Sequence, residues 1–159
     1  MKPKRRKKGS VLFEAITMRE RFDFLVNVVA RKSARVAAYH LDQLGINPRH
    51  YAVMGIIDGR RMSQISLTGR LGLNKNVMVN LIDDLETKDL CRRVQNKANR
   101  REHHIHLTDK GREFLRQADQ LVVRSQKEFL QPLTPDERKT IMALLAKLMK
   151  DELDHEEDK

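Results

Sequence analysis

The sequence is poor in cysteine and in aromatic residues. Its 159 residues include one cysteine, Cys91, and no tryptophan, and aromatic residues make up 4 % of the chain. A single cysteine excludes an intrachain disulfide, which is typical of a reducing compartment, and we expect the protein in the cytoplasm. Because aromatic side chains are so few, we expect a core built mainly from Leu, Ile, Val and Met.

Long apolar runs are also missing. No stretch approaches the roughly 20 apolar residues that span a bilayer, so we expect no membrane partner. The basic start of the chain is not followed by the apolar segment of a secretory signal, because Glu14 interrupts the run Val11-Leu12-Phe13. A glycine-rich phosphate loop, a nucleophile elbow, a metalloprotease helix and carboxylate pairs in an apolar setting are equally absent. We therefore expect neither an enzyme nor a bound cofactor.

Positive charge, by contrast, is abundant. The formal net charge is +10, and 34 % of the residues are charged. Six lysines and arginines crowd residues 1–10 and six acidic residues crowd residues 151–159, so we expect a disordered basic tail and an acidic tail. The body between these tails remains basic, which is typical of a protein that binds a polyanion. A basic surface that is merely solvated would give the same composition.

Apolar spacing and capping residues predict a mainly α-helical chain. A long first helix is expected from about Met18 to Leu44, before Gly45. The pair Asn47-Pro48, with Asn as N-cap and Pro at the first helical position, predicts a second helix that ends at Gly59. Ser63 is expected to cap a short third helix ending near Leu71. The apolar positions of that helix are Ile65, Leu67 and Leu71.

The second half of the chain predicts a fourth helix, a β-hairpin and two more helices. Gly72 makes a turn and Asn74 caps the fourth helix, which carries a buried stripe and ends near Lys88. Alternating runs at 90–94 and 103–107 flank a polar, basic loop and predict the hairpin. Thr108 caps the fifth helix, Pro132 ends it, and the capping box Thr134-Pro135-Asp136-Glu137 starts the last one. The stripe of the fourth helix consists of Met78, Leu81, Ile82 and Leu85.

Two short helices joined by a tight turn and followed by a hairpin form a winged helix-turn-helix. We therefore predict a mainly α fold with a small β-hairpin, whose DNA-binding region spans 46–111. An N-terminal helix region at 11–45 and C-terminal helices at 112–150 would flank it. Each would leave an apolar stripe exposed in a single copy, so we expect a symmetric homodimer that buries both.

The fourth helix is the candidate recognition helix, because a single helix fits the major groove of DNA. Opposite its buried stripe, Asn side chains would read adenine, Val would pack on a thymine methyl group, and Lys would meet a phosphate or guanine. Basic residues of the hairpin, Arg92 among them, would grip phosphates. A solvated helix face and a wet charged loop are the plainer alternatives. The candidate DNA-binding residues are Ser63, Lys75, Asn76, Val77, Val79, Asn80, Asp83, Arg93, Lys97, Arg100 and Arg101.

Four motifs follow one another along the chain: Ser63-Gln64 with Leu67 and Leu71-Gly72-Leu73, then Leu81-Ile82-Asp83 with Leu85-Glu86, Asn99-Arg100-Arg101, and Leu107-Thr108-Asp109-Lys110-Gly111. In this order they resemble the MarR family of bacterial regulators (multiple antibiotic resistance regulators). The resemblance covers about residues 20–150. It implies a dimer closed by the first and last helices, Arg101 as a wing arginine in the minor groove, and often a small-molecule pocket between the dimer and DNA-binding regions.

The sequence departs from the family pattern at several positions. Asn99 replaces the usual aspartate of an Asp-x-Arg pair, so Arg101 would be less firmly aimed. Asp84 stands where a basic residue is common, and Asn76 and Val77 replace the usual Ser or Thr, which predicts a different sequence preference. Asp89 occupies the usual glycine position at the helix end, which predicts weaker capping.

Cysteine and histidine offer two further hypotheses. Cys91 could be a redox sensor, but an apolar hairpin position and the absence of a resolving cysteine favour a core residue. His104 and His106, which follow His103 in the sequence, would share one face of a strand and could bind zinc. The alternative is that these histidines contact a phosphate or water.

The sequence thus predicts a sequence-specific regulator that binds double-stranded DNA as a homodimer on a pseudopalindromic operator. The resemblance implies a repressor and a possible small-molecule ligand that releases it. The rival hypothesis is a basic RNA-binding or architectural nucleic-acid-binding protein without effector control. Stacking aromatic residues would favour that rival, and they are scarce here.

Overall fold

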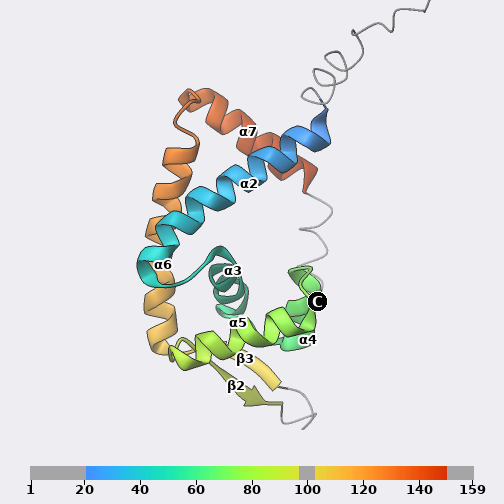
Figure 1. Cartoon of the computed structure of the whole chain (residues 1–159), viewed down its shortest axis with the longest axis vertical. Coiled ribbons are helices and arrows are strands. Elements are labelled where there is room, and N and C mark those ends of the chain that lie inside the picture. The colour runs from blue at the N-terminus through green and yellow to red at the C-terminus, as the bar shows by residue number, and fades with distance from the viewer. Residues whose placement is uncertain (1–20, 97–102, 150–159) are drawn as a thin grey trace, which may run out of the picture.

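The computed structural model describes residues 21–96 and 103–149. A long helical part and a compact helix–sheet part lie at opposite ends of the molecule (Figure 1). The helical part holds α2 (Phe22–Leu41), the 3-10 helix η1 (Asp42–Leu44), α6 (Asp109–Phe129) and α7 (Pro135–Leu148). Helix α6 packs along α2 and extends from the hairpin to α7, so it connects the two parts.

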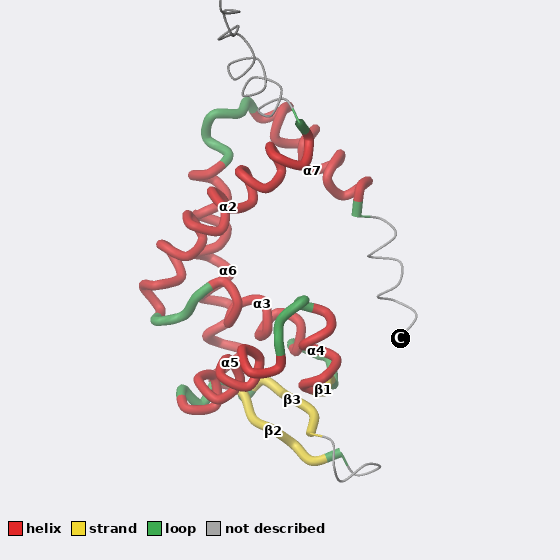
Figure 2. Tube along the Cα trace, turned by 45° about the vertical axis from the view of Figure 1, so that its right-hand side comes forward, coloured by secondary structure: helices red, strands yellow, loops and turns green. Residues whose placement is uncertain are grey.

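The helix–sheet part holds the helix-turn-helix and the wing. It consists of α3 (Pro48–Ile57), β1 (Met62–Ser63), α4 (Gln64–Arg70), α5 (Lys75–Thr87), β2 (Cys91–Gln95) and β3 (His103–Leu107). The strands form an antiparallel sheet in the order β1-β3-β2. Figure 2 shows this sheet beside α4 and α5, at the end of the molecule opposite α7. The expected winged helix-turn-helix fold is confirmed.

The core lies between α3, α4, α5 and the sheet. The stripe expected on α5 is buried, with Met78, Ile82 and Leu85 at 0 % exposure. From the sheet, Ile105 and Leu107 reach the same cluster, and so does Cys91. Burial of this apolar surface is the main force that holds α5 at a fixed angle to the wing.

Local capping chemistry explains where the helices begin. The side chains of Asn47, Ser63, Asn74, Thr108 and Thr134 each accept a hydrogen bond from a backbone N–H in the first turn of the next helix. These caps confirm the five predicted N-caps, including the box at Thr134. Helix α6 ends at Phe129, three residues before Pro132.

Three features differ from the sequence expectations. The first helix gives way to a 3-10 turn after Leu41 instead of continuing to Leu44, and its expected start at Met18 lies outside the described residues. Strand β1 was not expected, because two residues are too few to show an alternating pattern. Ile65, expected on the apolar side of α4, is 82 % exposed. Leu67, two residues further along this two-turn helix, takes the core-facing position instead.

The junction of α5, β2 and α6 is held by backbone groups. Asp89 has a φ of 57°, the left-handed conformation that usually selects glycine, which confirms that it stands at a glycine position. Thr108 Oγ1 donates to the Asp89 carbonyl at 2.8 Å and accepts from the Gly111 N–H at 2.8 Å. The predicted motif around Thr108 therefore ties the start of α6 to the end of α5.

Among the described residues, no helix combines the length and the apolarity that crossing a bilayer requires.

Candidate nucleic-acid interface

The polar face of α5 is open to solvent. Lys75, Asn76 and Asn80 are exposed, on the side of α5 opposite its buried stripe. Asn74 stands just before them and uses its side chain to accept from Val77 N–H at 2.9 Å. Two amides and one ammonium group thus project from the first two turns, where hydrogen-bond donors and acceptors could meet base edges.

The two valines of the predicted face are less available than expected. Val77 and Val79 are both half-buried, and Val77 packs against the core. Val77 therefore helps to seat the helix, and each of the two valines offers only part of its side chain to solvent. Ser63 is also occupied, because it is 6 % exposed and its hydroxyl accepts from Ser66 N–H at 3.1 Å as the cap of α4.

Asp83 and Arg93 are brought together rather than presented separately. Arg93 Nη2 lies 2.7 Å from Asp83 Oδ1, and Arg93 also pairs with Glu86 through Nη1. The backbone N–H of Arg93 donates to Glu86 Oε1 at 2.7 Å. Burial opposes the charge of Arg93, but hydrogen bonding to Asp83 and the fields of both carboxylates outweigh it and raise its pKa. This clamp fastens β2 to the exposed side of α5.

The tip of the hairpin lies outside the described residues. This tip contains Lys97, Arg100 and Arg101, and the departure at Asn99 falls there too. The two strands that lead to it are described, and their register pairs Gln95 with His103 and Val94 with His104. The structure therefore fixes the base of the wing beside α5.

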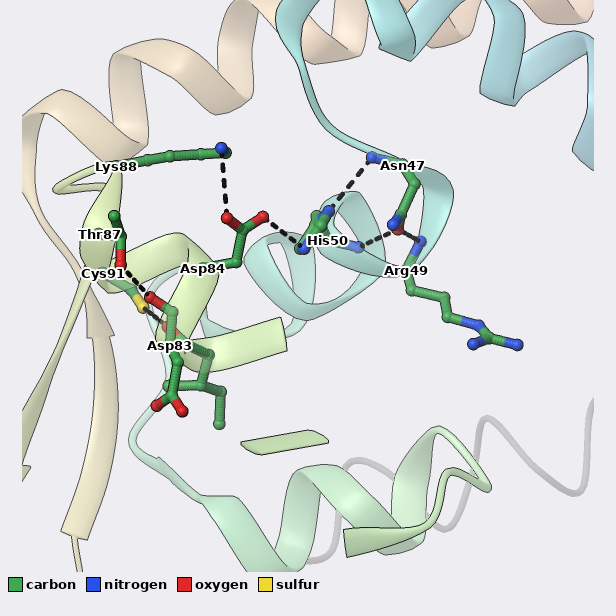
Figure 3. A network of polar contacts seen from close by, with 9 residues as sticks. Asn47, Arg49, His50, Asp83, Asp84, Thr87, Lys88 and Cys91 are labelled. Carbon is green, nitrogen blue, oxygen red and sulfur yellow. Dashed lines mark hydrogen bonds and ion pairs between the residues drawn. The ribbon is translucent and has the colours of Figure 1, made fainter. Parts of the chain in front are cut away.

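A polar network connects α3 to the last turn of α5 (Figure 3). His50 Nδ1 accepts from the backbone N–H of Asn47 at 3.2 Å, so the proton of the neutral ring sits on Nε2. That Nε2 lies 3.1 Å from Asp84 Oδ2, and Lys88 Nζ lies 3.3 Å from the other oxygen. Burial lowers the pKa of His50, the field of Asp84 raises it, and that of Lys88 lowers it again; the balance is a lowered pKa.

Sequence reasoning missed His50 entirely. In the sequence, Asp84 stands out only as an acid at a position where a basic residue is common, and the sequence assigns it no partner. The signal was the capping pair Asn47…His50, in which histidine takes the place that Glu or Gln holds in a capping box. The buried partner of Asp84 follows only from the packing of α3 on α5.

Cys91 behaves as a core residue. It is 3 % exposed within the apolar cluster, and its thiol lies 3.9 Å from the Ile82 carbonyl oxygen. Burial and the field of Glu86 raise the pKa of this thiol to about 12, against a smaller lowering effect of Arg93. A thiol that stays protonated is a poor nucleophile toward peroxide, which supports the core interpretation.

The histidines of β3 do not gather with other metal-binding side chains in the described part of the chain. There, no group of three or more His, Cys, Asp or Glu residues is placed to hold an ion. His104 and His106 do share one face of the sheet, as their spacing predicted, with ring centroids 6.5 Å apart.

Comparisons with known proteins agree with this architecture. The sequence pattern described as "MarR family" matches residues 46–103. The HTH-type transcriptional regulator YkoM of Bacillus subtilis (strain 168) is 30 % identical over 132 residues, which cover 80 % of this chain and 86 % of that protein. A relative from Thauera aromatica, named as a transcriptional regulatory protein for the hcr operon, is 29 % identical over 105 residues. That match spans 65 % of this chain and 63 % of the relative.

Solved structures give the same result in three dimensions. Wild-type MarR from E. coli superposes with a TM-score of 0.76 at 25 % identity, covering 81 % of this chain and 97 % of that one. The repressor CouR, solved with a 23-mer DNA duplex, superposes with a TM-score of 0.74 at 24 % identity, covering 91 % and 99 % of the two chains. The winged fold, the matched region and the YkoM relationship show that this chain belongs to the MarR family of DNA-binding transcriptional regulators.

Proposed function

We propose that the protein is a repressor that binds a pseudopalindromic operator as a homodimer and reads it with α5. The observation that carries the proposal is the solvent-exposed polar face of α5, with Asn76 and Asn80 opposite a fully packed stripe. Bidentate Asn–adenine contacts in the major groove are each worth about 1–3 kcal/mol of discrimination. Lys75, at the first helical position, would meet a phosphate or a guanine.

The wing would supply the phosphate contacts of the complex. Lys97, Arg100 and Arg101 stand in the sequence between β2 and β3, so a duplex bound by α5 would pass close to the end of the sheet from which they continue. Asp83 and Arg93 would act indirectly, because each is already engaged with the other. In this proposal they orient the wing relative to α5. Val77 seats the helix, and both Val77 and Val79 offer methyl groups to thymine.

Exposed apolar side chains support the homodimer. On α2, Phe22 is 68 % exposed, and on α7, Leu148 is 67 % exposed. Such a concentration at one end of a soluble chain indicates a buried surface between copies. Two-fold pairing through α2 and α7 would place the two α5 helices on one side, with half-sites about 34 Å apart as an operator requires. The other large apolar side chains that are exposed on α2, on α7 and at the residue after α7 are Leu25, Val26, Val28, Val29, Tyr39, Met142, Leu144, Leu145 and Met149.

Selection of bound sequences from a pool of random duplexes tests sequence-specific binding. We expect two inverted half-sites. Asn76→Ala and Asn80→Ala should each relax one base position while affinity for random DNA stays nearly unchanged. Equal losses on selected and random duplexes would show that the two residues only position the helix.

The rival function requires a matched comparison. The full chain would be titrated at one salt concentration with the selected duplex, a random DNA duplex, each single strand, and an RNA duplex of the selected sequence. We expect the DNA duplex to bind at least about 10³-fold more tightly than random DNA. Tighter binding of RNA, or no preference among duplexes, would favour the RNA-binding or architectural role.

Repression and release can be measured with the selected operator placed over a promoter. Binding there should exclude polymerase and lower transcription in a purified system, whereas a rise would indicate an activator. Small-molecule release is proposed from the family resemblance. A compound that raises the unfolding temperature and dissociates the operator complex would establish it, since a ligand stabilises the state that it binds.

A further inference from the structure

The outward face of the wing sheet gathers basic side chains. Residues alternate along β3, and Ile105 and Leu107 point into the core at 0 % and 4 % exposure, so His104 and His106 point away from it. Arg92 is the register partner of His106 and shares its face. Arg61, immediately before β1, is close enough to act on the His106 ring. We call these four residues, Arg61, Arg92, His104 and His106, the wing face.

The wing face has an excess of positive charge. Within residues 21–96 and 103–149, neither Arg61 nor Arg92 makes an ion pair, whereas Arg93, Arg112 and Arg116 all pair with carboxylates. Cations held close together repel one another, and an anion placed among them removes that cost. A zinc ion would need more ligands than two histidines provide.

We propose that the wing face binds a phosphate of the operator, and that His106 takes up a proton as the phosphate docks, so that mild acidification strengthens DNA binding. The proposal rests on the function proposed above, because the sheet lies beside α4 and α5 at one end of the molecule (Figure 2). A duplex that α5 and the wing tip hold together has a backbone next to this sheet.

The charge environment of His106 provides the switch. Partial burial lowers its pKa, and the nearby Arg61, His104 and Arg92 lower it further, in that order. In the free protein the ring is therefore neutral near pH 7. A docked phosphate reverses the sign of the local field and favours the charged ring. By linkage, a group whose pKa is higher in the complex binds its proton together with the DNA, so affinity rises as pH falls toward the free pKa.

The chain offers a matched control for this proposal. His103 lies on the same strand and is exposed, but it alternates to the opposite side from His104. Full-length wild type, His106→Gln and His103→Gln would be titrated with the selected duplex between pH 6 and pH 8 at constant ionic strength. Circular dichroism at each pH would confirm that all three remain folded.

We expect wild-type affinity to rise about three- to tenfold from pH 7.5 to pH 6, since uptake of one proton gives at most a tenfold change per pH unit. His103→Gln should keep this response, and His106→Gln should lose most of it. Arg92→Gln, at an exposed position, should make the log–log salt slope shallower by about 0.9.

The outcomes separate this proposal from the proposed function. If no duplex binds wild type, the proposed function fails. If the duplex binds but the pH response is the same in His106→Gln as in wild type, the wing-face proposal is overturned. An unchanged salt slope in Arg92→Gln would also overturn it, and so would a pH response that EDTA abolishes, since the histidines would then serve a metal ion.

Discussion

Gly111 lies so close to Leu90 that a Cβ on Gly111 would be 1.9 Å from the Leu90 carbonyl oxygen. The same carbonyl accepts from Thr108 N–H at 3.1 Å, so it cannot move without breaking the junction between β2 and α6. This contact gives a physical reason for the glycine that ends the motif Leu107-Thr108-Asp109-Lys110-Gly111: the first turn of α6 packs on the backbone that follows α5.

Gly111→Ala should therefore destabilise the protein by about 3 kcal/mol or more, because the clash is with backbone and not with a flexible side chain. The free energy of unfolding in urea measures the effect. Gly55→Ala is the matched control, since Gly55 lies in α3 with nothing within 4 Å of an added Cβ. That control should gain up to about 1 kcal/mol from helix propensity. Equal changes in both variants would contradict the packing argument.

Replacing Asp89 by glycine should change the free energy of unfolding in the direction opposite to Gly111→Ala. Its left-handed backbone strains a residue with a Cβ, and its carboxylate lies just past the C-terminal end of α5, where a negative charge is unfavourable. Asp89→Gly should raise the free energy of unfolding by about 1 kcal/mol. Asp89→Ala removes the charge but keeps the Cβ in the left-handed backbone, so it should gain less than Asp89→Gly. A loss of stability in the glycine variant would show that the Asp89 side chain has a stabilising role that outweighs the strain.

The clamp between Asp83 and Arg93 predicts that Arg93 positions the wing and does not contact DNA. The salt dependence of operator affinity tests this prediction. Arg93→Gln should lower operator affinity by misaligning the wing, yet leave the log–log salt slope unchanged, because the guanidinium is held by α5. A direct phosphate contact would instead make the slope shallower by about 0.9. A double-mutant cycle with Asp83→Asn should give a coupling of about 0.5–1 kcal/mol in folding stability, as expected for a partly exposed pair.

Cys91 should be inert toward oxidants. Its thiol is buried and its pKa is raised to about 12, so almost no thiolate exists at neutral pH. Cys91→Ser should bind the operator like wild type, and peroxide should release neither protein through this position. Peroxide-induced release of wild type that is absent in Cys91→Ser would restore the redox hypothesis.

The sequence was informative where one residue decides a local conformation. Capping side chains and the apolar stripe of α5 mark helix starts and the core face without knowledge of the fold, so these predictions are confirmed. It was less informative where contacts join distant segments. The pairing of Arg93 with Asp83 and that of His50 with Asp84 depend on how β2 and α3 pack on α5. The exposure of Ile65 depends on which face of α4 meets the core.

His50 predicts a loss of stability on acidification. Its pKa is lowered by burial more than Asp84 raises it, and Lys88 lowers it further. The unfolded chain therefore binds a proton more readily than the folded one. Stability is complete above the ordinary pKa of 6.5 and falls as pH decreases from there toward the folded pKa.

This loss of stability on acidification is explained by the hydrogen bond that His50 accepts. Nδ1 accepts the Asn47 N–H and must give up that bond to be protonated, so the cap of α3 weakens as the ring gains its charge. For a single proton the free energy of unfolding can change by at most about 1.4 kcal/mol per pH unit. Urea denaturation of wild type and His50→Gln between pH 7.5 and pH 5 isolates the contribution of this ring from that of His106, whose pKa is also lowered. We expect His50→Gln to be less stable than wild type at pH 7.5, and we expect its free energy of unfolding to change less with pH. Identical pH slopes for the two proteins would show that His50 does not carry the effect.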